Sequence, residues 1–189
     1  NDFQTIFVCP DGGYNSWYFD SPLQPSSQYA TFVAVELPAF VDAHYATIKH
    51  RLGRGISGLS MGGHGAFYLA MLHPKTFGTA TSMSGALDLM EANGKYEIAE
   101  KIGPNTRWQP YSVLEVMDST NGRNLQLLID CGVSDIFMEG NRRLHQKLLH
   151  QQVPHTYVER PGAHSWAYWK AALPYHLLFF QQQWLSISR

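Results

Sequence analysis

The stretch "RGISGLSMGGHGAFYLAMLHP" at residues 54–74 constrains the fold more than any other part of the chain. A short strand-like run ends in a turn, and the five glycines of the stretch surround one serine, Ser60. An apolar helix-like run follows and ends at His-Pro. A strand that turns sharply into a helix is the building unit of α/β proteins.

The rest of the chain repeats this alternation. Short apolar runs that read as buried strands occur at 4–10, 54–57, 77–84, 125–130 and 155–160. Helical patterns occur at 30–50, 61–73, 138–152 and 165–185, and Pro174 is expected to kink or divide the last of them. The pattern predicts a mostly parallel sheet with helices on both faces. The stretch 86–124 carries no clear strand, and we interpret it as a lid-like excursion over the carboxyl ends of the strands.

Composition limits the classes of function. The chain has 189 residues and a formal net charge of −1, which favours one globular domain over residues 1–189. No basic and aromatic run indicates a nucleic-acid surface, and no apolar run is long enough to span a membrane. The two cysteines, Cys9 and Cys131, are expected to be buried free thiols. The compartment is left open, with the cytoplasm slightly favoured over secretion or the periplasm.

The segment "GLSMG" at 58–62 fits the G-x-S-x-G pattern of a nucleophile elbow, with a strand before it and a helix after it. In such an elbow Ser60 stands above the sheet. Gly58 and Gly62 are expected to avoid collisions between the strand and the helix. The alternative is a glycine-rich turn with an incidental serine.

A serine nucleophile needs a histidine base and a carboxylate that orients it. His164 lies in "RPGAHSW", directly after the last expected strand, at the edge where the elbow also opens. Asp130 and Asp135 compete for the acid. We favour Asp135 because it lies in the loop beyond the strand, although it could instead cap the next helix. The order Ser60, Asp135, His164 is that of the α/β-hydrolases.

These segments resemble the putative-esterase family of α/β-hydrolases, which includes tributyrin esterases, S-formylglutathione hydrolases and feruloyl esterases. The resemblance extends over "CPDGGYNSWYFDSP" at 9–22, "SGLSMGGHGAFYLAMLHP" at 57–74, "SMSGALDL" at 82–89, "IDCGVSDIFMEGNRRLH" at 129–145 and "RPGAHSWAYW" at 160–169. It implies a Ser60–His164–Asp135 triad and an oxyanion donor at the backbone amide of Met61. The leucine in "GLSMGG" favours carboxylesterases over glutathione-thioester enzymes.

The implied function is hydrolysis of short-chain acyl or feruloyl-type esters through an acyl-enzyme, without a metal or cofactor. The expected partner is a small-molecule ester, and a homo-oligomer is left open. The alternatives are an S-formylglutathione hydrolase-like thioesterase or acyltransferase, or an inactive hydrolase that serves as a binding module. The residues expected to wall the substrate pocket are Tyr14, Asn15, Trp17, Tyr18 and Trp166, and Trp108 and Tyr111 are further candidates for closing the cleft.

The resemblance also raises an expectation about strands. In the fold of this family further strands precede the one expected at 4–10, and one of them lies between the counterparts of 4–10 and 54–57. We therefore expect this chain to be the C-terminal part of a longer protein, with these two segments about two strand spacings, ~10 Å, apart. A separate N-terminal segment or another chain would then complete the sheet, and it would also supply the second oxyanion donor.

Overall fold

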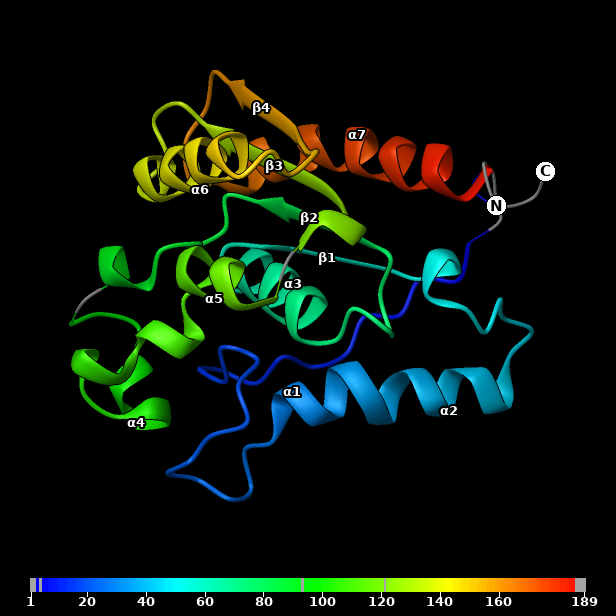
Figure 1. The fold of residues 1–189 in the computed structure, drawn as a ribbon, viewed down its shortest axis with the longest axis horizontal. Helices are drawn as coiled ribbons and strands as arrows, with labels where there is room; N and C mark the ends of the chain where they lie inside the picture. The colour runs from blue at the N-terminus through cyan, green and yellow to red at the C-terminus, as the bar shows by residue number, and fades with distance from the viewer. Residues whose placement is uncertain (1–2, 4, 93, 121, 186–189) are drawn as a thin grey trace.

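The computed structural model describes residue 3 and residues 5–92, 94–120 and 122–185. Its centre is a four-stranded, entirely parallel sheet with the strand order β1-β2-β3-β4 (Figure 1). The strands are β1 Gly55–Leu59, β2 Thr79–Met83, β3 Gln126–Gly132 and β4 Thr156–Arg160. Four of the five predicted strands are therefore confirmed, and their carboxyl ends meet at one edge of the sheet.

The predicted strand at 4–10 is wrong. Residues 5–10 belong to no strand, and residue 4 lies outside the described residues. The side chains of Ile6, Phe7 and Val8 are about half exposed, at 48%, 57% and 44%. Among the described strands β1 pairs with β2 alone, so residues 5–10 do not pair directly with it. The expected spacing of two strands between the two segments stays a prediction.

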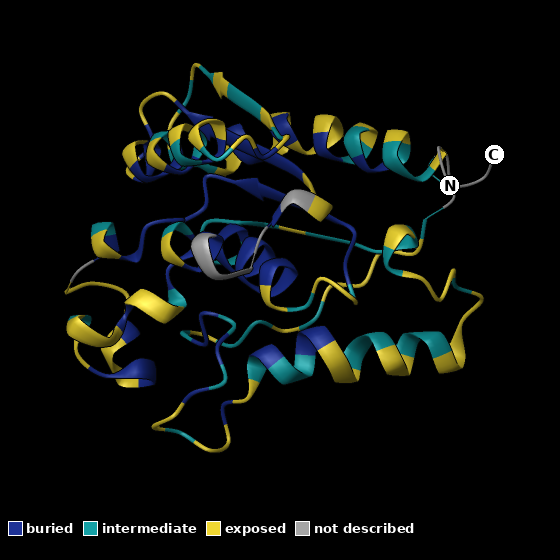
Figure 2. Cartoon of the chain, in the orientation of Figure 1, coloured by how far each residue is buried: buried dark blue, intermediate teal, exposed yellow. Residues whose placement is uncertain are grey.

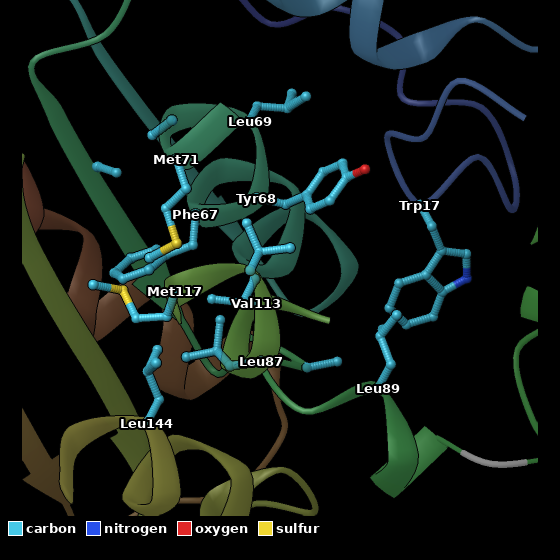
Figure 3. Close-up of a cluster of buried hydrophobic side chains, with 14 of the residues drawn as sticks. Trp17, Phe67, Tyr68, Leu69, Met71, Leu87, Leu89, Val113, Met117 and Leu144 are labelled. Carbon is cyan, nitrogen blue, oxygen red and sulfur yellow. The ribbon is translucent and has the colours of Figure 1, made fainter. Parts of the chain in front are cut away.

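Helices cover both faces of the sheet. The helices α3 (Met61–Leu72), α5 (Val113–Thr120) and α6 (Met138–His150) pack with the largest apolar cluster on one face. The helix α7 (Trp166–Leu185) packs against β2 and β3 on the other face. Figure 3 shows side chains of the larger cluster, including Phe67 from α3, Met117 from α5 and Leu144 from α6.

Successive strand residues serve the two faces in turn, as the pleat of a strand requires. In β3, Leu127 and Ile129 join the cluster beneath α3, α5 and α6, whereas Asp130 contacts Tyr168 of α7. The strand β2 is buried over its whole length, as Figure 2 shows. Burial on both faces explains why residues 127–129 of β3 read as a continuous apolar run.

The helix predicted at 30–50 is shorter than expected. The chain forms α1 (Tyr29–Thr31), a π-helical turn (Phe32–Glu36) and α2 (Leu37–His44), and Tyr45 is already extended. No residue of α2 is buried (Figure 2), so little apolar packing is available to prolong this helix.

Of the predictions for the other helices and for the cysteines, some are confirmed and others are wrong. The helix α7 is undivided and continues through Pro174, so the expected division does not occur. Residues 86–124 contain α4 (Ile98–Ile102), α5 and short 3₁₀ turns, and the described part of this stretch holds no strand, as expected. The 3₁₀ turns of the chain are Arg51–Gly53, Leu89–Ala92, Asn105–Arg107, Gln109–Tyr111 and Gly122–Asn124. Cys131 is buried, whereas Cys9 is exposed, contrary to expectation.

Over the residues that the structure describes, no helix is both long enough and apolar enough to cross a membrane.

Candidate active site

Ser60 lies at the sharp turn between β1 and α3. Its backbone has φ of +54°, a left-handed value that a residue with a side chain adopts only at a cost. The surroundings hold this conformation, because the Ser60 amide donates to the Met83 carbonyl at 2.9 Å and the His64 amide donates to the Ser60 carbonyl at 3.1 Å. The turn places the hydroxyl of Ser60 at the carboxyl edge of the sheet.

The glycines around Ser60 differ in their importance. A side chain at Gly58 would overlap the backbone of Gly62, and a Cβ at Gly63 would lie 2.7 Å from Ser82 Oγ. These positions need glycine because strand and helix approach so closely. At Gly62 the nearest atom is the Tyr18 hydroxyl at 3.7 Å, so the expected collision there is not found.

The loops after β3 and β4 are joined by backbone hydrogen bonds. The amide of Val133 donates to the Arg160 carbonyl, and the amide of Ser134 donates to the Gly162 carbonyl, both at 2.9 Å. The parallel pairing of the two strands thus extends into the loops. This continuation brings Asp135, in the first loop, beside His164, in the second.

Ser60, His164 and Asp135 form one hydrogen-bonded chain. Ser60 Oγ lies 2.9 Å from His164 Nε2, and His164 Nδ1 lies 3.0 Å from both carboxylate oxygens of Asp135. An ionised carboxylate only accepts hydrogen bonds, so Nδ1 carries the proton of a neutral His164. Nε2 is then the acceptor for the Ser60 hydroxyl, which is the tautomer that a general base requires.

The environment of Asp135 favours its ionised form. Burial by itself would raise the pKa of this carboxyl, but hydrogen bonds from His164 and from the Phe137 amide, the latter at 2.9 Å, outweigh burial and lower the pKa. The bond to the Phe137 amide lies just ahead of α6, so Asp135 also stabilises the entry to that helix. The position of Asp135 is therefore compatible with both roles that the sequence suggests, the orientation of His164 and the capping of the next helix.

Asp130, the alternative acid, contacts residues of β4 and α7 instead of His164. It is 1% exposed, contacts the Arg160 guanidinium, and accepts a hydrogen bond from the Tyr168 hydroxyl. His176 is the third neighbour, with its Nε2 3.4 Å from an Asp130 oxygen. These contacts tie β3 and β4 to α7.

Two aromatic rings fix the imidazole plane of His164. Phe137 meets it edge to face with ring centres 5.3 Å apart, and Trp169 does so from another side at 4.9 Å. Phe137 follows Asp135 in the loop after β3, and Trp169 lies in the first turn of α7. The packing restricts rotation of the ring, which keeps Nε2 directed at Ser60.

The backbone amide of Met61, the expected oxyanion donor, lies next to Ser60 at the start of α3. Met61 is the first residue of α3, and the first amides of a helix have no acceptor within the helix. Such amides, together with the helix dipole, favour negative charge beside Ser60.

A cleft of about 410 Å³ opens beside Ser60 and Met61. Three of the expected substrate-binding residues, Tyr14, Asn15 and Trp17, contribute to its wall. Three further residues of the wall were not expected from the sequence: Tyr96, Glu97 and Phe137. The segment 86–124 thus reaches the carboxyl edge of the sheet, as its interpretation as an excursion over that edge requires.

The other expected wall residues lie elsewhere. Tyr18 packs its ring against Gly65 of α3 beneath the elbow. Trp166 is 67% exposed and contacts Trp169, but it is not part of the cleft wall. Trp108 is buried in the core and donates to the Gly103 carbonyl, and Tyr111 packs on Phe19.

The described residues contain no group of three or more histidine, cysteine or acidic side chains that could hold a metal ion. The chemistry that the site offers is that of its own side chains. A hydroxyl, a base in the correct tautomer, a buried carboxylate and a helix amide together suit attack on a carbonyl carbon.

Comparison with known proteins agrees with this geometry. The family model described as "Putative esterase" matches residues 4–180. The chain belongs to this family. Its fold is that of the α/β-hydrolases, as the solved structures that resemble it show.

Three similar proteins illustrate the family. Esterase Rv1288 of Mycobacterium tuberculosis is 25% identical over 190 residues, which cover 84% of this chain and 41% of the relative. The diacylglycerol acyltransferase/mycolyltransferase Ag85A of the same species is 27% identical and covers 88% and 60%. A solved ferulic acid esterase has a TM-score of 0.75 at 26% identity and covers 88% and 64%. The chain therefore spans about two fifths to two thirds of the length of these proteins.

Proposed function

We propose that this chain is a serine carboxylesterase that hydrolyses short-chain acyl or feruloyl-type esters through an acyl-enzyme. The observation that carries the proposal is the continuous hydrogen-bonded chain from Ser60 Oγ through His164 to Asp135. It lies beside a cleft large enough for a small ester, in a chain of the putative-esterase family.

The proposed reaction has two halves. Ser60 Oγ attacks the ester carbonyl while His164 Nε2 takes its proton, and Asp135 stabilises the imidazolium that forms. The Met61 amide donates to the developing oxyanion, and the loss of one such donor typically costs about 10²–10³ in turnover. His164 then gives its proton to the leaving alcohol, and a water molecule activated by the same histidine releases the acid.

Labelling with a fluorophosphonate probe and hydrolysis of p-nitrophenyl butyrate test the proposal together. Wild-type protein should be labelled and active, whereas Ser60→Ala should lose both properties. Wild-type protein that is folded but neither labelled nor active would instead support the binding-module alternative. Esterase activity that persists in Ser60→Ala would contradict the assignment of the nucleophile.

A panel of acyl donors separates the enzyme alternatives. Methyl ferulate and p-nitrophenyl butyrate report carboxylesterase activity, and S-formylglutathione reports thioesterase activity. Transfer of the acyl group to an added alcohol instead of water reports acyltransferase activity. We expect the oxygen esters to be the better substrates.

We also propose that a further polypeptide strand completes the sheet beside β1. This strand would come from a separate N-terminal segment or from another chain. The support is that β1 pairs with β2 alone among the described strands, and that residues 6–8 expose apolar side chains.

A further inference from the structure

The cleft beside Ser60 combines aromatic rings with one carboxylate. Tyr14, Trp17, Tyr96 and Phe137 supply the rings, and Glu97 is the only formally charged one among the described residues that line the wall. Aromatic faces attract cations through their quadrupole, and a carboxylate attracts them directly. This combination therefore points to a ligand that carries positive charge.

The side chain of Glu97 is held in the wall by Asn15. Asn15 Nδ2 donates to Glu97 Oε2 at 2.9 Å and also lies 3.4 Å from Glu100 Oε2, so one amide bridges two carboxylates. The remaining lone pairs of the Glu97 carboxylate stay available for a ligand, because an ionised carboxylate accepts about four hydrogen bonds.

The backbone that carries Glu97 is strained. Tyr96 and Glu97 are consecutive residues with left-handed φ values of +59° and +55°. The Trp17 indole donates to the Tyr96 carbonyl at 3.1 Å and packs on the Tyr96 ring, and both contacts hold the turn in place. Strain of this kind persists only where the surroundings impose it, and here it presents both side chains to the cleft.

Nearby cations do not cancel this charge from within the cleft. Lys101 directs its ammonium to the Gln24 side chain at 2.6 Å. Arg142 is paired with Glu139 and Glu159. Lys95 is exposed in the same loop as Glu97, but it is not part of the cleft wall.

We propose that Glu97 is a specificity-determining residue that selects esters carrying a positively charged group, such as an alkylammonium, over neutral or anionic esters. The inference rests on the proposed esterase function and names its substrate class. It also disfavours the thioester of glutathione, whose net charge is negative. Because Glu97 is exposed, the preference is modest, at about fivefold.

Matched pairs of esters test the inference. Choline butyrate and its neutral isostere 3,3-dimethylbutyl butyrate differ in the charge of the alcohol, and an analogous pair places the trimethylammonium group on the acyl chain. In wild-type protein we expect kcat/KM to favour the cation by about fivefold in at least one pair, and Glu97→Gln to reduce that ratio to about one. Glu100→Gln, which alters the same Asn15 contact outside the cleft wall, should reduce the ratio much less.

The two proposals can fail separately. Wild-type protein that hydrolyses the neutral esters without preferring the cations would overturn the inference and leave the esterase function intact. A preference that survives in Glu97→Gln would overturn it as well. If no ester is hydrolysed, binding of benzyltrimethylammonium measured by Trp fluorescence still decides: tighter binding by wild type than by Glu97→Gln supports the inference, and equal binding overturns it.

Discussion

The two aspartates near the end of β3 have different contacts, and we expect them to have different tasks. Asp135 accepts from His164, whereas Asp130 is enclosed by Arg160 of β4 and Tyr168 of α7. We expect Asp135→Asn to lower kcat by about 10⁴, because an amide cannot stabilise the imidazolium or fix its tautomer. Asp130→Asn should instead lower the melting temperature, with a much smaller effect on kcat.

Kinetics with p-nitrophenyl butyrate and thermal unfolding of both variants distinguish these outcomes. A larger loss of kcat in Asp130→Asn than in Asp135→Asn would assign the acid to Asp130.

His64 gives the protein a pH-dependent stability. It is fully buried among Trp17, Phe19 and Tyr68, and its Nε2 lies 2.9 Å from the Tyr111 carbonyl. Burial lowers its pKa to about 4, although the bond to Tyr111 partly opposes this shift. The unfolded chain takes up this proton near pH 6.5, so between about pH 6.5 and 4 protonation favours the unfolded state.

The contribution of His64 to stability is therefore complete above about pH 6.5 and declines as the pH falls toward 4. The slope is at most about 1.4 kcal/mol per pH unit for one proton. We expect His64→Gln to flatten the dependence of the unfolding free energy on pH in this range, and His150→Gln, at an exposed position, to leave it unchanged. Urea unfolding at several pH values measures both, and an unaltered slope in His64→Gln would refute the assignment.

At the scale of the elements, the turn from β1 into α3 makes different demands on its glycines. A methyl group at Gly58 would overlap the Gly62 backbone, whereas one at Gly62 meets nothing closer than 3.7 Å. We expect Gly58→Ala to destabilise the protein by about 1–3 kcal/mol or more. Gly62→Ala should be neutral or stabilising, because alanine favours a helix over glycine by up to about 1 kcal/mol.

Denaturant unfolding of the two variants gives the comparison directly. Equal losses of stability would show that the turn needs glycine at both positions for a reason other than space.

The local sequence pattern predicted strands correctly where each strand has a neighbouring strand in this chain to pair with. The runs that became β2 and β3 are buried along almost their whole length, and those that became β1 and β4 each pair with one of these two strands. The run at 4–10 is apolar too, but a strand also needs a neighbour to pair with, and pattern alone does not supply one. Pro174 led to the prediction of a division that does not occur. The helix α7 packs along the sheet on either side of this proline and remains continuous.

The site was predictable to the extent that chemistry and topology determine it. Ser60, Asp135 and His164 each follow a strand at the same edge, and strand order leaves few other candidates. Phe137 could have been found from its place beside Asp135. Tyr96 and Glu97 could not have been found in this way. Both have a left-handed backbone conformation in an irregular segment, and neither residue type indicates such a conformation in a sequence.

At the scale of the whole molecule, the apolar surface is unevenly distributed. The strand β1 ends the sheet, residues 6–8 expose Ile, Phe and Val, and α2 contributes no buried residue. Exposed strand edges and apolar patches favour association with other chains. The opposite end of the sheet at β4 differs, because Arg142, Glu159 and Tyr157 form a charged and hydrogen-bonded network over it.

This asymmetry predicts that the 189-residue chain associates through its apolar N-terminal segment. We expect sedimentation velocity to show a weight-average mass that rises with concentration between about 1 and 100 μM, the range in which exposed apolar surface drives association. Phe7→Lys should reduce the association, because it places a charge in the exposed apolar run. Leu149→Lys, at a comparably exposed apolar position on α6, should not, since Leu149 is 52% and Phe7 57% exposed. If the chain stays monomeric over this concentration range, or if both substitutions change the association equally, then residues 5–10 and the β1 edge are not the surface through which it associates.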